Sequence, residues 1–333
     1  MTDVPALVVS SAALPIDIRP LLGSGVSARI PERGSLSRSE LLAELAGADA
    51  LVSLLDVAVD DELLARAPHL RVVANCAVGY DNVDLAAATR RGIIVTNTPD
   101  VLTDATADFT FALLLGAARR LVEGDALVRG GGWRGWAPDL LLGADVAGRT
   151  IGIVGLGRIG CAVARRARGF GMSILHAGPR PVAAAAELGA RHVPLDQLLA
   201  ASDFVTLHVP LSPATHHIID GAALARMKPT AILINTARGA CVDEPALAAA
   251  LARGGLAGAA LDVFAAEPAV HPALLASPRA LLAPHVGSAT HSARGRMAEL
   301  CGRAIGAVLA GRRPDHVVNP QVLAAPATGE VGP

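Results

Sequence analysis

The chain has 333 residues, with 29 Lys and Arg against 30 Asp and Glu, so its formal net charge is −1. That length suggests about two domains of ~150 residues each, and the near-zero charge argues against a protein that binds nucleic acid through a basic surface. A hydrophobic content of 52% with 18% charged residues excludes disorder over most of the chain. An aromatic content of 2% also argues against base-stacking platforms.

Several residue types are too scarce or too scattered for some kinds of chemistry. Lys228 is the only lysine, so a P-loop lysine or a Schiff-base lysine elsewhere in the chain is excluded. We expect the Lys228 side chain to be solvated at the end of a helix. The Cys residues form no Cys-x-x-Cys pair or Cys/His cluster, so we expect no metal site. We see no secretory signal and no apolar run near the ~20 residues of a membrane helix. A cytoplasmic protein without a membrane partner is therefore expected.

Short apolar runs alternate with helical patterns in the first hundred residues. The runs are rich in β-branched residues without polar alternation, which is typical of buried parallel strands. These predicted strands cover 6–9, 50–55, 70–77 and 93–96. The predicted helices between them cover 39–46, 60–67 and 82–91.

A second set of alternating elements follows a long predicted helix over 104–121. Its predicted strands cover 150–155, 173–176, 204–209, 231–235, 258–263 and 280–283. A further helix is expected over 291–310, and 319–333 is expected to be a loose tail. The alternation predicts the α/β class with two Rossmann-like, doubly wound parallel sheets, which place ligands at the carboxyl ends of their strands.

A glycine-rich turn joins the predicted strand at 150 to a helix. In the run Gly155-Leu156-Gly157-Arg158-Ile159-Gly160, the first glycine permits the tight turn and the second lets the backbone approach a pyrophosphate. The third allows close packing of helix on strand, and the helix N-terminus supplies amide groups. Because the motif lies between a strand and a helix within a βα series, it predicts a bound dinucleotide.

The end of the next strand bears on the choice between NAD(H) and NADP(H). The run His176-Ala177-Gly178-Pro179-Arg180 has no carboxylate to accept a ribose hydroxyl or repel a 2′-phosphate. Arg180 can pair with a phosphate, although an arginine here can also be an ordinary loop residue. We expect NADP(H) to be preferred, with NAD(H) possible.

Three polar residues follow apolar strands of the second set. Arg238 follows the run at 232–235, Glu267 follows 258–263, and His285 follows 280–283. Because parallel strands end at one edge of their sheet, all three can meet in one crevice.

Several further motifs stand in order along the chain. They are Val78-Gly79-Tyr80-Asp81-Asn82-Val83-Asp84, the run from Thr98 to Asp108, the glycine loop, Asn235-Thr236-Ala237-Arg238-Gly239, Leu261-Asp262-Val263 with Glu267-Pro268, and Pro284-His285-Val286-Gly287-Ser288-Ala289-Thr290. Through these motifs the chain resembles, over about residues 40 to 318, the D-2-hydroxyacid dehydrogenase family and within it the glyoxylate/hydroxypyruvate reductases.

The resemblance implies a hydride transfer between a nicotinamide cofactor and a small 2-oxo acid. His285 would be the general acid, Glu267 would hydrogen-bond it and favour its imidazolium, and Arg238 would hold the substrate carboxylate. Asp262 would orient the nicotinamide carboxamide. The further cofactor contacts implied are Thr106, Pro210, Thr236, Ala237 and Gly287, and the further substrate contacts are Leu55, Val78, Gly79, Ser288 and Trp136.

The resemblance also implies a domain layout and a partner. A discontinuous substrate domain would comprise 1–100 and 290–320, the dinucleotide-binding domain 101–289, and the tail 321–333, with the active site between the domains. The segment holding Trp133 and Trp136 would cross the interface of a homodimer, and Trp136 would cap the neighbour's substrate pocket. These two residues can also simply bury a loop. In many NADP-using relatives an arginine stands where this chain has Pro179, so Arg180 is displaced by one position.

Two other functions share these motifs. One is a dinucleotide-sensing, corepressor-like binding protein, although we see no partner-binding extension. The other is a 3-phosphoglycerate-type dehydrogenase, which usually carries a C-terminal regulatory domain for which this chain leaves no room. Formate oxidation is disfavoured because it needs no acid and so would not pair Glu267 with His285.

Overall fold

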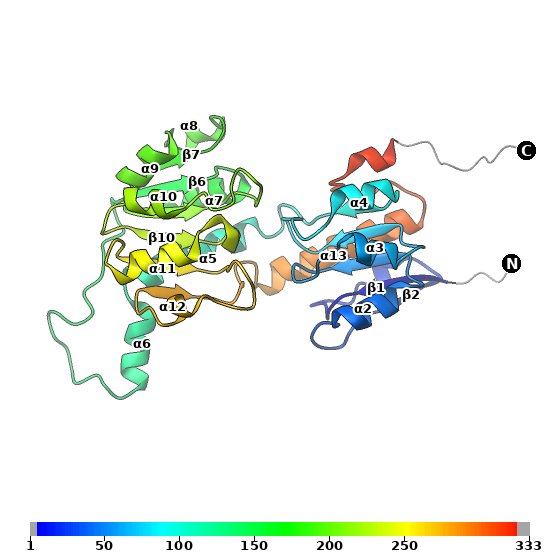
Figure 1. The fold of residues 1–333 in the computed structure, drawn as a ribbon, viewed down its shortest axis with the longest axis horizontal. Helices are drawn as coiled ribbons and strands as arrows, with labels where there is room; N and C mark the ends of the chain where they lie inside the picture. The colour runs from blue at the N-terminus through cyan, green and yellow to red at the C-terminus, as the bar shows by residue number, and fades with distance from the viewer. Residues whose placement is uncertain (1–4, 325–333) are drawn as a thin grey trace, which may run out of the picture. The chain divides into compact units, whose positions relative to one another are not determined.

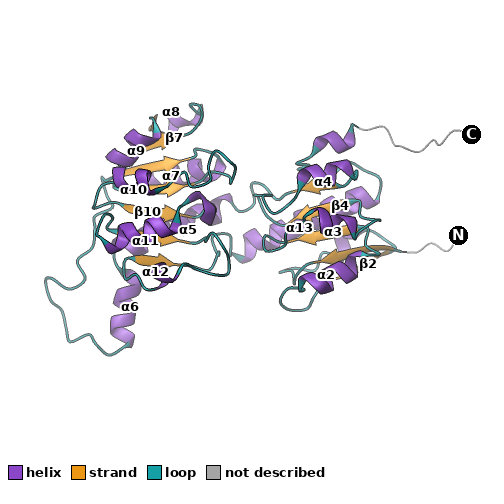
Figure 2. Ribbon diagram, in the orientation of Figure 1, coloured by secondary structure: helices purple, strands orange, loops and turns teal. Residues whose placement is uncertain are grey.

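The computed structural model describes residues 5–324, which form two compact units (Figure 1). Among the described residues, unit 1 comprises those up to Leu102 and those from Thr290 onward, and unit 2 is Thr103–Ala289. Each unit has a wholly parallel sheet with helices along it (Figure 2). The predicted α/β class with two doubly wound sheets is therefore confirmed.

The sheet of unit 1 has five strands in the order β2-β1-β3-β4-β5. This is the flavodoxin-like order of a doubly wound fold. The strands are β1 (Ala6–Ser10), β2 (Val26–Arg29), β3 (Ala50–Ser53), β4 (Val72–Asn75) and β5 (Ile94–Thr96).

Side chains of these strands alternate between two helix layers, because successive residues of a strand point to opposite faces. Val9, Leu51 and Val73 pack with one layer, whereas Val8 and Val52 pack with the other. The first layer contains α2 (Arg38–Leu45), α3 (Asp61–Ala65) and α4 (Leu85–Arg90). The second contains α1 (Arg19–Leu22) and α13 (His291–Leu309), so the predicted helix at 291–310 covers a sheet formed by the first hundred residues.

The segment after α13 also packs on this sheet. The Asn319 side chain is buried, accepts a hydrogen bond from the Val95 amide at 2.8 Å and donates one to the Ile93 carbonyl at 2.9 Å. The short helix η2 (Pro320–Leu323) follows. The prediction of a loose tail is wrong for 319–324, because Asn319 satisfies backbone groups at the edge strand β5; residues 325–333 lie outside the described part.

The sheet of unit 2 has seven strands in the order β12-β11-β10-β9-β6-β7-β8. The order reverses between β6 and β9, which is where a doubly wound sheet opens a crevice. The strands are β6 (Thr150–Val154), β7 (Ser173–Ala177), β8 (Ala190–His192), β9 (Phe204–Leu207), β10 (Ile232–Asn235), β11 (Gly258–Leu261) and β12 (Ala280–Leu282).

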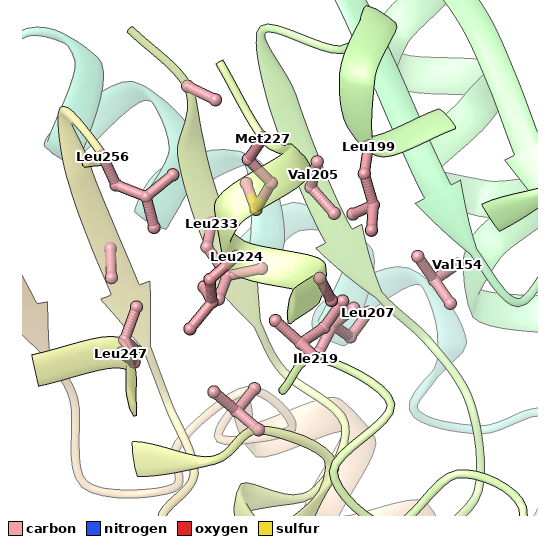
Figure 3. Close-up of a cluster of buried hydrophobic side chains, with 14 of the residues drawn as sticks. Val154, Leu199, Val205, Leu207, Ile219, Leu224, Met227, Leu233, Leu247 and Leu256 are labelled. Atoms are coloured by element: carbon pink, nitrogen blue, oxygen red, sulfur yellow. The ribbon is translucent and has the colours of Figure 1, made fainter. Parts of the chain in front are cut away.

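Helices cover both faces of this sheet. Figure 3 shows one face, where Val205 and Leu233 of the strands lie near Leu224 of α10 and near Met227, which directly follows that helix. That layer contains α9 (Leu195–Ala201), α10 (Gly221–Arg226), α11 (Glu244–Ala252) and α12 (Pro272–Leu275). The other contains α5 (Thr103–Ala118), α7 (Arg158–Gly169) and α8 (Ala184–Leu188).

Some elements differ from the sequence-based expectation. The helix predicted over 104–121 is two helices, because Arg120 adopts a left-handed φ of 53° and starts α6 (Leu121–Arg129). Glu123, one turn into α6, pairs with the Arg120 guanidinium. Strands β2 and β8 were not predicted, since each is a short edge strand with exposed residues. Across residues 5–324, the helices are all too short or too polar to cross a membrane.

Lys228 is not the solvated side chain that the sequence predicted. Its Nζ donates to Asp203 Oδ1 at 2.8 Å, and Asp203 Oδ2 accepts the Thr150 amide at 2.9 Å. The two side chains are 36% and 23% exposed. Burial raises the pKa of Asp203, but the Lys228 hydrogen bond and the Thr150 amide outweigh it and hold the pKa below the ordinary value. The pair thus ties β9 to β6 and to the segment before β10.

We expect Asp203→Asn to lower the free energy of unfolding by about 1 kcal/mol at neutral pH. The value is that of a charged hydrogen bond, reduced because the pair is partly exposed to solvent. Because the folded-state pKa of Asp203 is depressed, its contribution is present above 3.8 and is lost as the pH falls through the folded value. Denaturant unfolding of both proteins between pH 3 and 7 should show their difference shrinking toward acid. Lys228→Met, which removes the other partner of the ion pair, serves as the matched variant. A stability difference between wild type and Asp203→Asn that grows toward acid would contradict the role given to Asp203.

Candidate active site

The glycine loop of unit 2 lies at the switch point between β6 and β9. Gly155 has a φ of 94°, and its amide donates to the Ala177 carbonyl at 2.9 Å. A Cβ on Gly155 would lie 2.6 Å from the His208 carbonyl oxygen, and one on Gly160 would lie 2.2 Å from the Gly155 oxygen. These two glycines are therefore required by the protein's own packing.

Gly157 has a different role, since a Cβ there would meet nothing within 4 Å. It precedes α7, whose N-terminus is not capped by any side chain. Open space above an uncapped helix N-terminus is suited to an anion such as a pyrophosphate. Leu156 is buried, and Arg158 and Ile159 begin α7.

The end of β7 lies beside this loop, because Gly155 bonds to Ala177. Gly178 and Arg180 follow and are exposed, while His176 is fully buried within the strand. The Gly178 carbonyl is 3.2 Å from His192 Nε2. No carboxylate lies on the stretch from His176 to Arg180.

Arg238 is held on a turn after β10. Buried Asn235 accepts the Ala237 amide at 3.0 Å and donates to the Arg238 carbonyl at 2.9 Å. A Cβ on Gly239 would lie 1.9 Å from the carbonyl carbon of Phe264, so this turn packs directly on the segment after β11. That contact brings the loop of Arg238 to the loop that carries Glu267.

Asp262 holds the turn that carries His285. Its carbonyl accepts the His285 amide at 2.8 Å, and its carboxylate oxygens accept the amides of Val286 at 2.7 Å and Gly287 at 2.8 Å. His285 has a φ of 53°, a left-handed conformation that costs a non-glycine residue of order 1–3 kcal/mol. Burial raises the pKa of Asp262, and the two amide bonds offset part of that effect. The expected contact of Asp262 with a nicotinamide carboxamide stays a prediction.

His285 and Glu267 form a direct pair. His285 Nδ1 lies 2.8 Å from Glu267 Oε2, while Glu267 Oε1 accepts the Phe264 amide at 2.9 Å. Burial raises the pKa of Glu267, but His285, the Phe264 amide and the charge of Arg238 together hold it below its ordinary value. Because the turn of Arg238 packs on the segment after β11, the structure brings together the loops that carry all three residues. The imidazole edge bearing Nε2 is the one not bonded to Glu267.

A second histidine near the loop is unsuited to proton transfer. His208 follows β9, and its Nε2 is 2.9 Å from Thr206 Oγ1. Burial lowers the pKa of His208 to about 3, so it stays neutral at physiological pH. His285 is therefore the better candidate for an acid.

The remaining predicted residues of unit 2 are partly gathered around these loops. A Cβ on Gly287 would lie 3.6 Å from Thr106 Cγ2, so α5 reaches the turn of His285. Thr236 bonds to Thr110 at 3.0 Å, which links α5 to the turn of Arg238. Ser288 is half-buried beside Gly287, and Pro210 is exposed three residues after β9. Trp136 is 84% exposed in the loop after α6, so neither it nor Trp133, at 54%, buries that loop within the chain.

Leu55, Val78 and Gly79 belong to unit 1. The carbonyl of Gly79 accepts from Asn75 Nδ2 at 2.8 Å, and that of Val78 accepts from Asn97 Nδ2 at 2.8 Å. These amides fix the loop after β4. The part of the three predicted residues in substrate binding, and the location of the site between domains, stay predictions.

Several positioning residues were not predicted. Asn235 and Asn75 are each the last residue of a buried strand. A polar residue at the end of an apolar run is the sequence signal that could have identified them. Glu244 is buried and accepts the Ala265 amide at 2.7 Å, which supports the loop before Glu267. Its sequence context, the first turn of a helix, did not distinguish it from a surface residue. Within residues 5–324 we find no cluster of three or more His, Cys, Asp or Glu suited to a metal ion.

The dinucleotide loop and the Arg-Glu-His cluster can be compared with known proteins. A family model described as "D-isomer specific 2-hydroxyacid dehydrogenase, NAD binding domain" matches residues 111–287. The glyoxylate reductase of Thermococcus onnurineus is 53% identical over 293 residues, which are 86% of this chain and 88% of that protein. The glyoxylate reductase of Aeropyrum pernix is 49% identical over 290 residues, covering 85% and 86%.

Solved structures agree with this result. A protein from Thermus thermophilus has a TM-score of 0.88 and 46% identity, covering 94% of this chain and 99% of that one. The NADPH-dependent glyoxylate/hydroxypyruvate reductase of Sinorhizobium meliloti, in complex with NADP and malonate, has a TM-score of 0.81 and 34% identity, covering 94% and 97%. The chain therefore belongs to the D-isomer specific 2-hydroxyacid dehydrogenase family, and unit 2 contains its dinucleotide-binding domain.

Proposed function

We propose that this chain is a reductase of small 2-oxo acids, glyoxylate or hydroxypyruvate, which produces the 2-hydroxy acid, as the D isomer where the product is chiral, with NADPH as the preferred cofactor. The observation that carries the proposal is the 2.8 Å contact of His285 with Glu267 on the unit that contains the glycine loop. The names of the two curated relatives and of the Sinorhizobium meliloti protein support the substrate class.

The chemistry follows from the pair. When bound, the reduced nicotinamide would supply a hydride to the carbonyl carbon of the substrate. His285 donates the Nε2 proton to the carbonyl oxygen, while Glu267 holds Nδ1–H and so fixes the ring orientation. The left-handed backbone of His285, held by Asp262, aims the ring before substrate arrives.

Arg238 binds the carboxylate of the substrate and polarises its carbonyl. A guanidinium suits both tasks, because its planar fork matches a carboxylate and its charge is permanent. The Asn235 hydrogen bonds fix the backbone of the turn, and the guanidinium itself donates to the Ala237 carbonyl at 2.8 Å. A binding protein that only senses dinucleotides needs neither a paired acid nor a carboxylate anchor, so this cluster favours an enzyme.

Preference for NADPH rests on the end of β7. Arg180 is exposed there, and no carboxylate stands between His176 and Arg180 to repel a 2′-phosphate. The NADPH-dependent relative from Sinorhizobium meliloti supports this choice.

We also propose a cytoplasmic homodimer whose interface is formed by α6 and the loop after it. Both extend away from the sheet of unit 2 (Figure 1). They expose large apolar side chains, which a monomer rarely gathers in one region. These are Leu121, Val122, Val128, Trp133, Trp136, Leu140 and Leu142.

The acid is tested with His285→Ala. Turnover of glyoxylate should fall ~10²–10⁴-fold while the NADPH dissociation constant stays nearly unchanged, because a general acid acts in the transition state. Steady-state assays with glyoxylate, hydroxypyruvate and phosphohydroxypyruvate, each with NADPH and NADH, also identify the substrate. His271→Ala is the matched control, since the His271 ring only caps α12. If His285→Ala retains the wild-type turnover, His285 is not the general acid.

The cofactor preference is tested with Arg180→Ala. One charged contact is worth ~1.5–3 kcal/mol, so NADPH binding should weaken about 10–100-fold and NADH binding should hardly change. Gly178→Asp should favour NADH, because the position is exposed, open for a Cβ, and places a carboxylate at the strand end. Gly157→Ala should weaken the binding of NADPH and of NADH alike. If the wild-type protein prefers NADH, or if Arg180→Ala weakens the binding of NADPH and NADH equally, the proposed preference for NADPH is wrong.

The dimer is tested with the double variant Trp136→Ser/Leu142→Ser. Each buried side chain contributes ~1.5–3 kcal/mol, so self-association should weaken about 100-fold or more in analytical ultracentrifugation. Leu275→Ser is the control, because Leu275 is 63% exposed on α12, outside α6 and its following loop. A wild-type protein that sediments as a monomer, or a double variant that stays fully dimeric, would contradict this interface.

A further inference from the structure

Two of the four cysteines lie together in unit 1, whereas the Arg-Glu-His cluster belongs to unit 2. Cys76 directly follows β4, and Cys301 lies on the face of α13 that covers the same sheet. Ala74 and Cys76 point to the same face of the strand, because they are two residues apart. The Cys301 thiol donates to the Ala74 carbonyl oxygen at 3.8 Å, and Cys76, two residues after Ala74, packs against the buried cluster that contains Cys301.

The two thiols are unequal. The hydrogen bond from Cys301 lowers the pKa of Cys76, burial opposes it, and the charge of Arg294 on α13 lowers it further. The pKa of Cys301 is raised well above its ordinary value by the same hydrogen bond and by burial. Cys76 is half-buried and Cys301 is 1% exposed. A partly exposed thiol of lowered pKa next to a buried thiol of raised pKa is the arrangement of an attacking and a resolving cysteine.

The other two cysteines are less suited to oxidation. Cys161 is half-buried, its thiol is 3.6 Å from the Leu156 carbonyl oxygen, and burial raises its pKa. Cys241 is fully buried behind the turn of Arg238. Low thiolate content and poor access both slow oxidation.

We propose that Cys76 and Cys301 form a redox-active dithiol that a hydroperoxide converts to a disulfide joining β4 to α13. The Cys76 thiolate attacks the peroxide oxygen, which breaks the O–O bond, releases water or an alcohol after protonation and leaves a sulfenic acid on Cys76. The Cys301 sulfur then attacks the Cys76 sulfur, the S–O bond breaks, and water leaves with the Cys301 proton. In sum, two thiols and one hydroperoxide give one disulfide, one water and one alcohol, or two waters for hydrogen peroxide.

The disulfide has two consequences for unit 1. It covalently fixes the last long helix of the chain to a sheet made from the first hundred residues, which should raise the thermal midpoint. It also constrains the loop that starts at Cys76 and contains Val78, two residues further on. If Val78 binds the substrate carboxylate, which rests on the proposed function, closing the disulfide should raise the KM for glyoxylate several-fold.

The test is to treat the full-length protein with hydrogen peroxide and count free thiols after denaturation. Wild type should fall from four thiols to two, and a fragment joining Cys76 to Cys301 should be lighter than the separate peptides by about 2 Da. Dithiothreitol should restore four thiols. Cys301→Ala, which keeps the core position apolar, should instead show a sulfenic acid on Cys76 that a dimedone-type probe traps.

Two further variants complete the test. Cys76→Ser should keep its three thiols at the dose that oxidises wild type, whereas Cys161→Ser should still lose two. Wild type that keeps four thiols, or that links Cys161 or Cys241, overturns the proposal. A disulfide that leaves the KM unchanged overturns its coupling to the loop. Reduced protein without any reductase activity contradicts the proposed function but leaves the thiol result standing.

Discussion

A parallel sheet carries apolar side chains on both faces, and both faces must be covered for the sheet to exist in water. In unit 2 the helices that connect the strands cover both faces, so Val205 and Leu233 pack on one side and Phe204 and Ile232 on the other. Unit 1 has helices between its strands mainly on one face. Its second face depends on α13, and the discontinuous unit follows from that requirement.

The same arrangement gathers chemistry at one edge of each sheet. In unit 2 the glycine loop, the end of β7 and the turns of Arg238, Asp262 and His285 all follow strands that run in one direction. Hydrogen bonds made by buried polar side chains then fix each turn. Asp262 is the strongest example: its carboxylate accepts the amides of Val286 and Gly287, its backbone carbonyl accepts that of His285, and these bonds offset the strained backbone of His285. The proposed acid His285 and its partner Glu267 are partly exposed, whereas Asn235 and Asp262, which hold the turns, are buried.

Features set by local sequence could be predicted, and features set by distant contacts could not. Apolar runs placed the central strands, and spacing after those strands placed Arg238, Glu267 and His285. The break at Arg120 has no glycine or proline to mark it, and Asn319 closes an edge more than two hundred residues earlier in the chain. The amide contacts of Asn75 and Glu244 likewise depend on how loops pack. Exposure of Trp136 required the structure, because a tryptophan pair in sequence suits a buried loop equally well.

The position of α13 has a consequence for how the protein is made. About 190 residues separate β5 from α13, and a ribosome adds ~5–20 residues per second, so the two are synthesised roughly 10–40 s apart. During that interval unit 2 emerges complete, while Val8, Val52 and Ala74 of the nascent chain await their covering helix. The inserted unit can therefore fold first. The first hundred residues, although synthesised earliest, are the part that most needs shielding by chaperones until translation ends.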